Sequence, residues 1–205
     1  MKIIDISNPV KMGIVVWPNS IGPDLKIKKG DLWTETEINM NLHTGTHIDA
    51  PLHRIQGGAT IDEVPLDEFM GKALVVDLPD AKIITAKDLR GIKSADRLLF
   101  KTSNSKSKQN KFNKHFVGLS PDAAEWVVGH KVKLVGTDYL SVAQFNKQPE
   151  VHDILLRNKV VVLEGLDLSG VKPGIYQLIC LPLKLVGTEA APVRAVLIDN
   201  IKYKN

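Results

Sequence analysis

Short apolar runs alternate with segments of helical pattern from residue 72 onward. The runs KALVVDLP, DRLLFKTS, KVKLVGTD and KVVVLEGLDL have the length and composition of buried strands. Between them lie TAKDLRGI, SPDAAEWVVGHK and QPEVHDILLRN, and Thr85 and Ser120 stand at the N-cap positions of the first two. This alternation predicts an α/β fold with flanking helices, which GIYQLICLPLKLVG and APVRAVLID close as further strands.

The first half of the chain has a β-rich pattern that begins with IIDIS. In TEINMNLH, apolar residues at positions 38, 40 and 42 alternate with polar residues at positions 37, 39 and 41. Alternation with a period of two predicts a half-buried strand. That strand would run directly into a histidine-rich stretch.

The size and composition of the chain are those of an ordinary globular protein. Its 205 residues, 43% of them hydrophobic, are expected to form a single domain over residues 1–205. No apolar run reaches the roughly 18 residues that a membrane span needs. The opening MKIIDISNPV has no signal-peptide core, because Asp5 interrupts it. We therefore expect a cytoplasmic protein without a membrane partner, in which the one cysteine, Cys180, is a buried hydrophobe rather than a nucleophile.

The net charge of +4 is mild. The densest basic stretch, FKTSNSKSKQNKFNKHF at residues 100–116, contains five lysines. A nucleic-acid-binding surface would also need arginines and stacking aromatic residues. We expect this stretch to be a solvated loop and the protein to have no nucleic-acid partner.

Three of the six histidines lie in NLHTGTHIDAPLHR, residues 41–54. Chance, a polar turn whose histidines bond to backbone groups, and a metal site are the competing interpretations. His47 and Asp49 are two residues apart, so on an extended segment their side chains point to the same side. Gly45 allows the chain to fold back between His43 and His47. This spacing favours the metal site.

The ligand set indicates which metals such a site would bind. Imidazole and carboxylate suit zinc, manganese or ferrous iron, and no cysteine lies nearby. Pro51 biases Ala50 away from helix, which excludes a pair of ligands on one helix. His53, four residues beyond Asp49, could be a further ligand or an acid/base group beside the metal.

Further ligands are expected elsewhere in the chain, and two residues are candidates. Glu164 ends the apolar run VVVLEG, where a carboxylate is costly unless it is paired or coordinated. Its alternative interpretation is a strand-end residue turned toward solvent. His152 lies on the preceding helical segment, and alone it is more typical of a helix surface.

Residues 43–53, HTGTHIDAPLH, match the pattern H-x-G-T-H-x-D-x-P-x-H. On this motif the chain resembles the metal-dependent cyclase-like hydrolases, which include bacterial kynurenine formamidases and isatin hydrolases. The similarity runs from DISNPVKMGIVVWPN to APVRAVL. It implies a swivelling β/β/α fold with a mixed sheet, and a homo-oligomer, either a dimer or a tetramer.

The resemblance also implies roles for individual residues. The implied metal ligands are His43, His47, Asp49, His152 and Glu164. In that pattern the first three hold one metal, Asp49 and His152 contribute to a second, and Glu164 bridges both or completes the set. His53 would be the catalytic acid/base, and Trp17 would line the substrate pocket.

The implied activity is hydrolysis of an amide or formamide C–N bond on a small, aromatic substrate by a metal-activated hydroxide, as in the arylformamidases of tryptophan catabolism. Zinc is the expected metal, as one or two ions, with manganese as the alternative. A second hypothesis is opening of a cyclic amide or lactone, as in isatin hydrolase, with manganese. A third is a metal-binding module without catalysis, which would leave His53 and Trp17 without a purpose.

Overall fold

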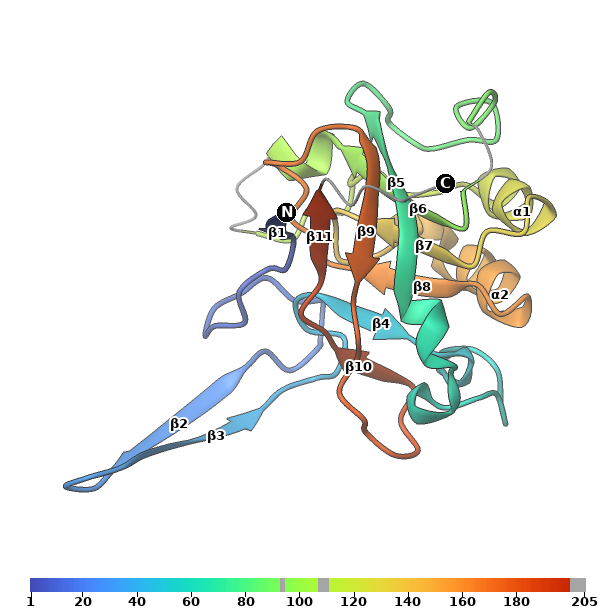
Figure 1. The fold of residues 1–205 in the computed structure, drawn as a ribbon. Coiled ribbons are helices and arrows are strands. Elements are labelled where there is room, and N and C mark those ends of the chain that lie inside the picture. The colour runs from blue at the N-terminus through green and yellow to red at the C-terminus, as the bar shows by residue number, and fades with distance from the viewer. Residues whose placement is uncertain (93–94, 107–110, 200–205) are drawn as a thin grey trace.

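The computed structural model of this 205-residue chain describes residues 1–92, 95–106 and 111–199. In these residues a nine-stranded sheet forms the body of the protein (Figure 1). Its strands, in spatial order, are β1 (Lys2–Asp5), β11 (Val196–Asp199), β9 (Gly174–Ile179), β5 (Met70–Leu78), β6 (Arg97–Thr102), β7 (Leu134–Thr137), β8 (Val161–Glu164), β4 (His47–Asp49) and β10 (Ala190–Pro192). The helices are α1 (Pro121–Gly129) and α2 (Gln148–Arg157), with short 3-10 turns η1 (Pro51–His53), η2 (Ile61–Glu63), η3 (Leu66–Phe69), η4 (Ser103–Lys106) and η5 (Phe145–Lys147).

The sheet is mixed. Strands β5, β6, β7 and β8 run parallel, and the remaining neighbours in the sheet pair antiparallel. Helices α1 and α2 lie side by side at one side of the body (Figure 1). The predicted α/β fold with a mixed sheet and flanking helices is therefore confirmed. No helix in the described part of the chain is long and apolar enough to cross a membrane.

The two faces of the parallel strands bury different cores. Leu98 and Phe100 on β6 belong to a cluster that includes Val127 of α1 and Leu155 of α2. Leu99, between them on β6, belongs to a second cluster with residues of β8, β9 and β11. Successive side chains of a strand point to opposite faces. The apolar runs in the sequence are continuous because these strands are buried on both sides.

The segment TAKDLRGI does not form the predicted helix. Residues 86–91 form hydrogen-bonded turns, in which the amide of Asp88 donates to the carbonyl of Thr85 and the amide of Ile92 to that of Leu89. The Asp88 carboxylate accepts hydrogen bonds from the amide and hydroxyl of Thr85. Gly91, with φ of +83°, then turns the chain. Nucleation of a helix is unfavourable in so short a segment, and hydrogen bonds between side chains and the local backbone form instead.

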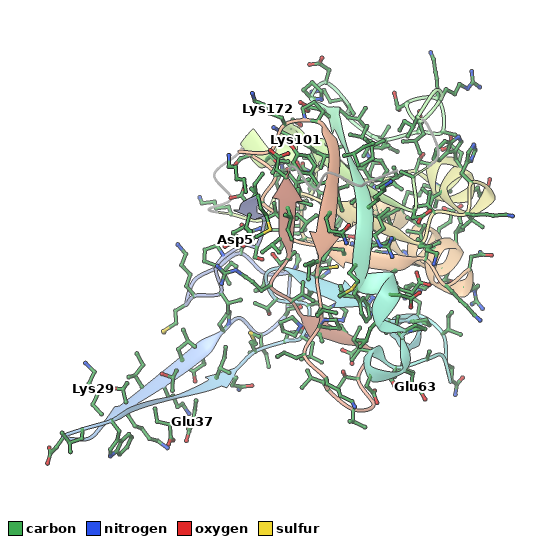
Figure 2. The ribbon with its side chains drawn as sticks, in the orientation of Figure 1. Asp5, Lys29, Glu37, Glu63, Lys101 and Lys172 are labelled. Atoms are coloured by element: carbon green, nitrogen blue, oxygen red, sulfur yellow. The ribbon has the colours of Figure 1, made fainter. Side chains whose placement is uncertain are left out.

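Strands β2 (Asp24–Lys29) and β3 (Thr34–Asn39) form a separate hairpin, called the arm below, that projects away from the body (Figure 1). Figure 2 shows Lys29 and Glu37 on the arm, far from the labelled side chains of the body. The predicted half-buried strand in TEINMNLH is wrong in its burial. β3 ends at Asn39, its residues are all exposed, and Ile38 is 52% exposed. Among the described strands β3 pairs only with β2, which leaves its apolar face exposed.

Part of the lysine-rich stretch 100–116, residues 107–110, lies outside the described residues. Within the described part, Lys101 is not a freely solvated residue. Its ammonium donates to the carbonyl oxygens of Ser169 and Val171.

Candidate metal centre

Pairing of β4 with β8 joins the histidine-rich segment to the distant Glu164. His47 lies opposite Glu164, and Asp49 lies opposite Val162. Side chains opposite each other in an antiparallel pair share one face of the sheet, and so do residues two apart on one strand. The imidazole of His47 and the carboxylates of Asp49 and Glu164 therefore converge on one point.

Two glycines allow the backbones to approach closely beside this point. Gly45 has φ of +67° and Gly165 has φ of +70°. A Cβ on Gly165 would stand 2.1 Å from the carbonyl oxygen of Gly45. The Gly165 carbonyl accepts hydrogen bonds from the hydroxyl of Thr46 at 2.5 Å and from Nδ2 of Asn8 at 2.8 Å. The turn in HTGTH is thereby held against the end of β8.

The predicted ligand atoms lie within a few ångströms of one another. Nε2 of His47 is 3.4 Å from Oδ1 of Asp49 and 3.4 Å from Oε2 of Glu164. Nε2 of His152, on α2, is 3.1 Å from Oε1 of Glu164 and 3.7 Å from Oδ2 of Asp49. Nδ1 of His43 is 2.9 Å from Oδ1 of Asp49. All five residues that the motif and its resemblance single out as ligands are thus brought together.

Backbone contacts orient two of the imidazoles. Nδ1 of His47 is 3.1 Å from the carbonyl oxygen of Gly45, and Nδ1 of His152 is 2.8 Å from that of Gln148. Since a carbonyl oxygen only accepts, each Nδ1 carries the proton. Each Nε2 then faces the carboxylates: in the protonated ring it can donate to them, as Nε2 of His152 does to Oε1 of Glu164 at 3.1 Å, and in the neutral ring its lone pair is available to a metal.

The buried polar atoms at the centre support a cation as the missing partner. Among the described residues, Nε2 of His47 and both carboxylate oxygens of Asp49 are buried without a hydrogen bond. The short contacts between these groups lack hydrogen-bond geometry, and leaving buried polar atoms unsatisfied is costly. Two sets of three residues each offer donor atoms that all lie within 4.8 Å of one another inside the set. The first set is His47, Asp49 and Glu164, and the second is His43, Asp49 and His53. The residues present therefore fit a divalent metal, with Asp49 common to both sets.

The charges of the buried groups depend on one another. Burial would lower the pKa of His47, but the carboxylates of Asp49 and Glu164 raise it to about 10. Burial likewise lowers the pKa of His152, whereas its contact with Glu164 produces a net rise. Burial raises the pKa of Asp49, but His43 and His47 hold it well below its ordinary value. The carboxylates are anionic near neutral pH and attract positive charge, whether from protons or from a metal ion.

His53 stands at the edge of this cluster, on η1. Its ring centroid is 4.4 Å from that of His43 and 5.7 Å from that of His152. Burial lowers the pKa of His53, so its imidazole is neutral at pH 7. A neutral histidine beside the ligand cluster can accept a proton. His53 also belongs to one of the two donor sets, so the geometry is equally compatible with His53 as a metal ligand.

Trp17, His43, His53 and His152 line one cavity of about 270 Å³, together with Glu164. Trp17 packs against Phe112, with ring centroids 5.1 Å apart, and against Phe145, with centroids 5.4 Å apart. The lining of the cavity thus combines the indole of Trp17, which other aromatic rings support, with imidazole and carboxylate groups. Such a cavity would accept a small aryl group.

Two residues near the cluster are absent from the sequence-based prediction. Oε1 of Glu189 is 3.5 Å from Nε2 of His43, and the Glu189 carbonyl accepts a hydrogen bond from the amide of Ala50. Glu189 precedes β10, which pairs with β4, and no local pattern in the sequence signals that pairing. Arg54 lines the cavity directly after His53, and nothing in the motif marks it.

The chain is similar to known proteins over most of its length. The model of the putative cyclase family matches residues 4–144. A kynurenine formamidase of Salinibacter ruber is 42% identical over 215 aligned residues, covering 97% of this chain and 98% of that protein. Cyclase-like protein 2 of Arabidopsis thaliana is 38% identical over 216 residues, covering 97% of this chain and 79% of that protein.

Solved structures share the fold. A potential metal-dependent hydrolase with cyclase activity superposes with a TM-score of 0.86 at 36% identity and covers 96% of each chain. Isatin hydrolase A from Labrenzia aggregata, bound to benzyl benzoate, superposes with a TM-score of 0.83 at 21% identity and covers 96% of this chain and 93% of that one. These superpositions confirm the cyclase-like fold that the motif predicts.

Proposed function

Because the chain belongs to the putative cyclase family, we infer that it is a metal-dependent hydrolase that cleaves a C–N bond other than a peptide bond. One observation carries this inference. Residues 43–53 and 152–164 converge, with His47 opposite Glu164, and at their centre Nε2 of His47 and both carboxylate oxygens of Asp49 are buried without a hydrogen-bond partner within the described chain. A buried cluster of this kind beside an open cavity is the arrangement that a hydrolytic metal site requires.

The proposed substrate is a formamide on a small aromatic compound. Support comes from the 42% identity to a protein named kynurenine formamidase and from the aromatic wall that Trp17 provides. The flat indole ring would pack against the aryl group and direct the amide toward the histidines. Opening of a cyclic amide remains the second candidate, because its support from isatin hydrolase A is a likeness of fold alone.

We propose that the cluster holds one or two divalent metal ions, zinc first and manganese as the alternative. The proposed ligands are His43, His47, Asp49, His152 and Glu164. Asp49 belongs to both compact donor sets, which supports a shared ligand between two ions. When bound, the metal would supply Lewis acidity, which polarises an amide carbonyl and makes water more acidic.

The chain's own residues would then move the proton. In the proposed hydrolysis, water adds to the formamide carbonyl carbon, the C–N bond breaks, and formate and the free amine are released. A ring nitrogen of His53 would take the proton from the attacking water and give it to the leaving nitrogen. Its lowered pKa keeps His53 in the neutral, proton-accepting form at the start of this cycle.

A substrate panel on metal-loaded protein tests the proposal. Metal content would be measured by elemental analysis after loading with zinc or manganese, and turnover would be followed with formanilide, isatin and a small lactone. We expect bound metal and faster hydrolysis of formanilide than of isatin. The reverse order would favour the cyclic-amide reaction, and metal binding without any turnover would favour a non-catalytic module.

We further propose that the protein is a homo-oligomer and that the arm is its contact surface. A two-stranded hairpin alone is marginally stable in water. Leu25 lies opposite Ile38 on the arm, and Ile27, 61% exposed, shares their face. On the other face, lysines of β2 lie opposite glutamates of β3. A second copy would cover the apolar face and could place its basic strand along an acidic one.

The cytoplasm is the proposed compartment. Cys180, the single cysteine of the chain, is a buried free thiol whose hydrogen donates to the carbonyl oxygen of Phe69. Burial raises the pKa of Cys180 to about 12, so it is protonated and unreactive. A fold that makes no use of disulfide formation is consistent with a reducing compartment.

A further inference from the structure

The cavity beside the candidate metal centre has one wall residue with a fixed positive charge. Arg54 is the only lysine or arginine among the described residues that line it. Arg54 follows His53 directly in the chain and closes η1 by donating its amide hydrogen to the carbonyl of Pro51. Its side chain is 35% exposed, so it is neither buried in the core nor free in solvent.

One nitrogen of the Arg54 guanidinium group is hydrogen-bonded, and its two terminal nitrogens are not bonded to any described residue. Its Nε donates a hydrogen bond to Oδ1 of Asp153 at 3.0 Å. No described residue accepts a hydrogen bond from its two terminal amino groups. Asp153 follows His152 on α2, and its other carboxylate oxygen is 3.8 Å from Arg157. The ion pair therefore joins the two residues that directly follow His53 and His152 in the chain, and of this pair Arg54 lines the cavity.

The ion pair of Arg54 with Asp153 adds little to the stability of the fold. A pair that is about one-third exposed contributes little to stability because solvent screens it. Its geometric effect is larger, since Asp153 restricts the rotation of the long Arg54 side chain. A guanidinium group whose terminal nitrogens are free can bind a carboxylate through two parallel hydrogen bonds.

We propose that Arg54 is a specificity-determining residue that binds a carboxylate on the substrate, and that Asp153 is its positioning residue. This inference rests on the proposed hydrolase function and narrows its substrate class. The preferred substrates are aryl formamides or related aryl amides that carry a carboxylate, with the ring against Trp17 and the carboxylate on Arg54. Neutral aryl amides fit the same cavity without that second anchor.

A kinetic comparison tests this preference. Metal-loaded wild-type protein and Arg54→Gln would be assayed with N-formylanthranilate, which carries a carboxylate, and with formanilide, which does not. In Arg54→Gln, kcat/KM for the carboxylated substrate is expected to fall at least about tenfold more than kcat/KM for the neutral one, mainly through KM. Equal losses for both substrates would overturn the proposal, because they would mean that Arg54 only supports η1.

Three further variants separate the effects of charge, side-chain geometry and position. Arg54→Lys keeps the charge but lacks the planar fork, so it should retain part of the preference. Asp153→Asn should weaken the preference less than Arg54→Gln does, because the cation remains but is less restrained. Arg157→Gln is the matched control: it removes the other arginine near Asp153, and the ratio of the two kcat/KM values should not change.

A binding measurement separates this proposal from the proposed reaction. Calorimetry would compare benzoate with benzamide, its neutral counterpart, on the metal-loaded wild type and on Arg54→Gln. We expect benzoate to bind at least about tenfold more tightly than benzamide in the wild type, and most of that preference to disappear in the variant. If this holds while no amide is hydrolysed, the reaction is wrong and the anion site stands. A preference that is independent of Arg54, in an active enzyme, refutes the anion site alone.

Discussion

Glu164 lies directly opposite His47 on the neighbouring antiparallel strand, with its Oε2 3.4 Å from Nε2 of His47. The two residues are far apart in the chain, and the pairing of β4 with β8 sets their separation. A slip of one residue would turn Glu164 to the opposite face of the sheet. The site therefore depends on the register of one short strand pair.

Replacing His53 tests the division between proton transfer and metal binding. His53→Asn should reduce kcat by about a hundredfold or more, because it removes the group that is proposed to accept and return the proton. Metal content measured by elemental analysis should stay at the wild-type level. Loss of metal from His53→Asn would instead identify His53 as a ligand within the set that includes His43 and Asp49.

Stability of the metal-free protein should depend on pH in a defined direction. In the folded state the pKa of His47 is raised from 6.5 to about 10, so the protonated form stabilises the fold. This contribution is fully present below about pH 6.5 and is lost as the pH rises toward 10. Urea unfolding of the metal-free protein should thus show decreasing stability over that range.

The metal-loaded protein is the control for this pH dependence. A bound cation would take the place of the proton between the carboxylates, so the loaded protein should not lose stability over the same range. Parallel stability curves with and without metal would contradict the assignment of His47 as a ligand.

Gly165 should tolerate no side chain. In Gly165→Ala the new Cβ would meet the carbonyl oxygen of Gly45, and φ of +70° is unfavourable for alanine. We expect a loss of at least about 2 kcal/mol in the free energy of unfolding, measured by urea titration, and weaker metal binding. Gly170→Ala is the matched control, since a Cβ there meets nothing within 4 Å. Equal stability of both variants would refute the close-approach argument.

The arm should control the oligomeric state. The double substitution Ile27→Glu and Ile38→Glu places charges on its exposed apolar face and should convert the oligomer to monomer in light scattering coupled to size exclusion. Leu66→Glu, at a residue of the body that is 68% exposed, should leave the mass unchanged. A wild-type protein that is already monomeric would refute the proposed oligomer, and a mass unaffected by the arm variant would place the contact elsewhere.

Local patterns in the sequence determined much of this protein. The alternation of strands and helices from residue 72 and the ligand types in HTGTHIDAPLH depend on neighbours a few residues apart. Hydrophobic periodicity therefore sufficed for β5, β6, β7, β8, α1 and α2. It failed at residues 85–92, where side-chain hydrogen bonds to the backbone replaced the helix.

Tertiary structure alone decided how these pieces meet. The pairing of β4 with β8 and β10 brings Glu164 and Glu189 to the histidines, and the ion pair of Arg54 with Asp153 joins two segments. The alternating pattern in TEINMNLH could not predict whether the strand is buried. The same alternation is compatible with a strand that packs against a core and with a strand on the exposed arm. Such features depend on contacts between residues that are distant in the chain, and no periodicity records which distant segment a strand will pair with.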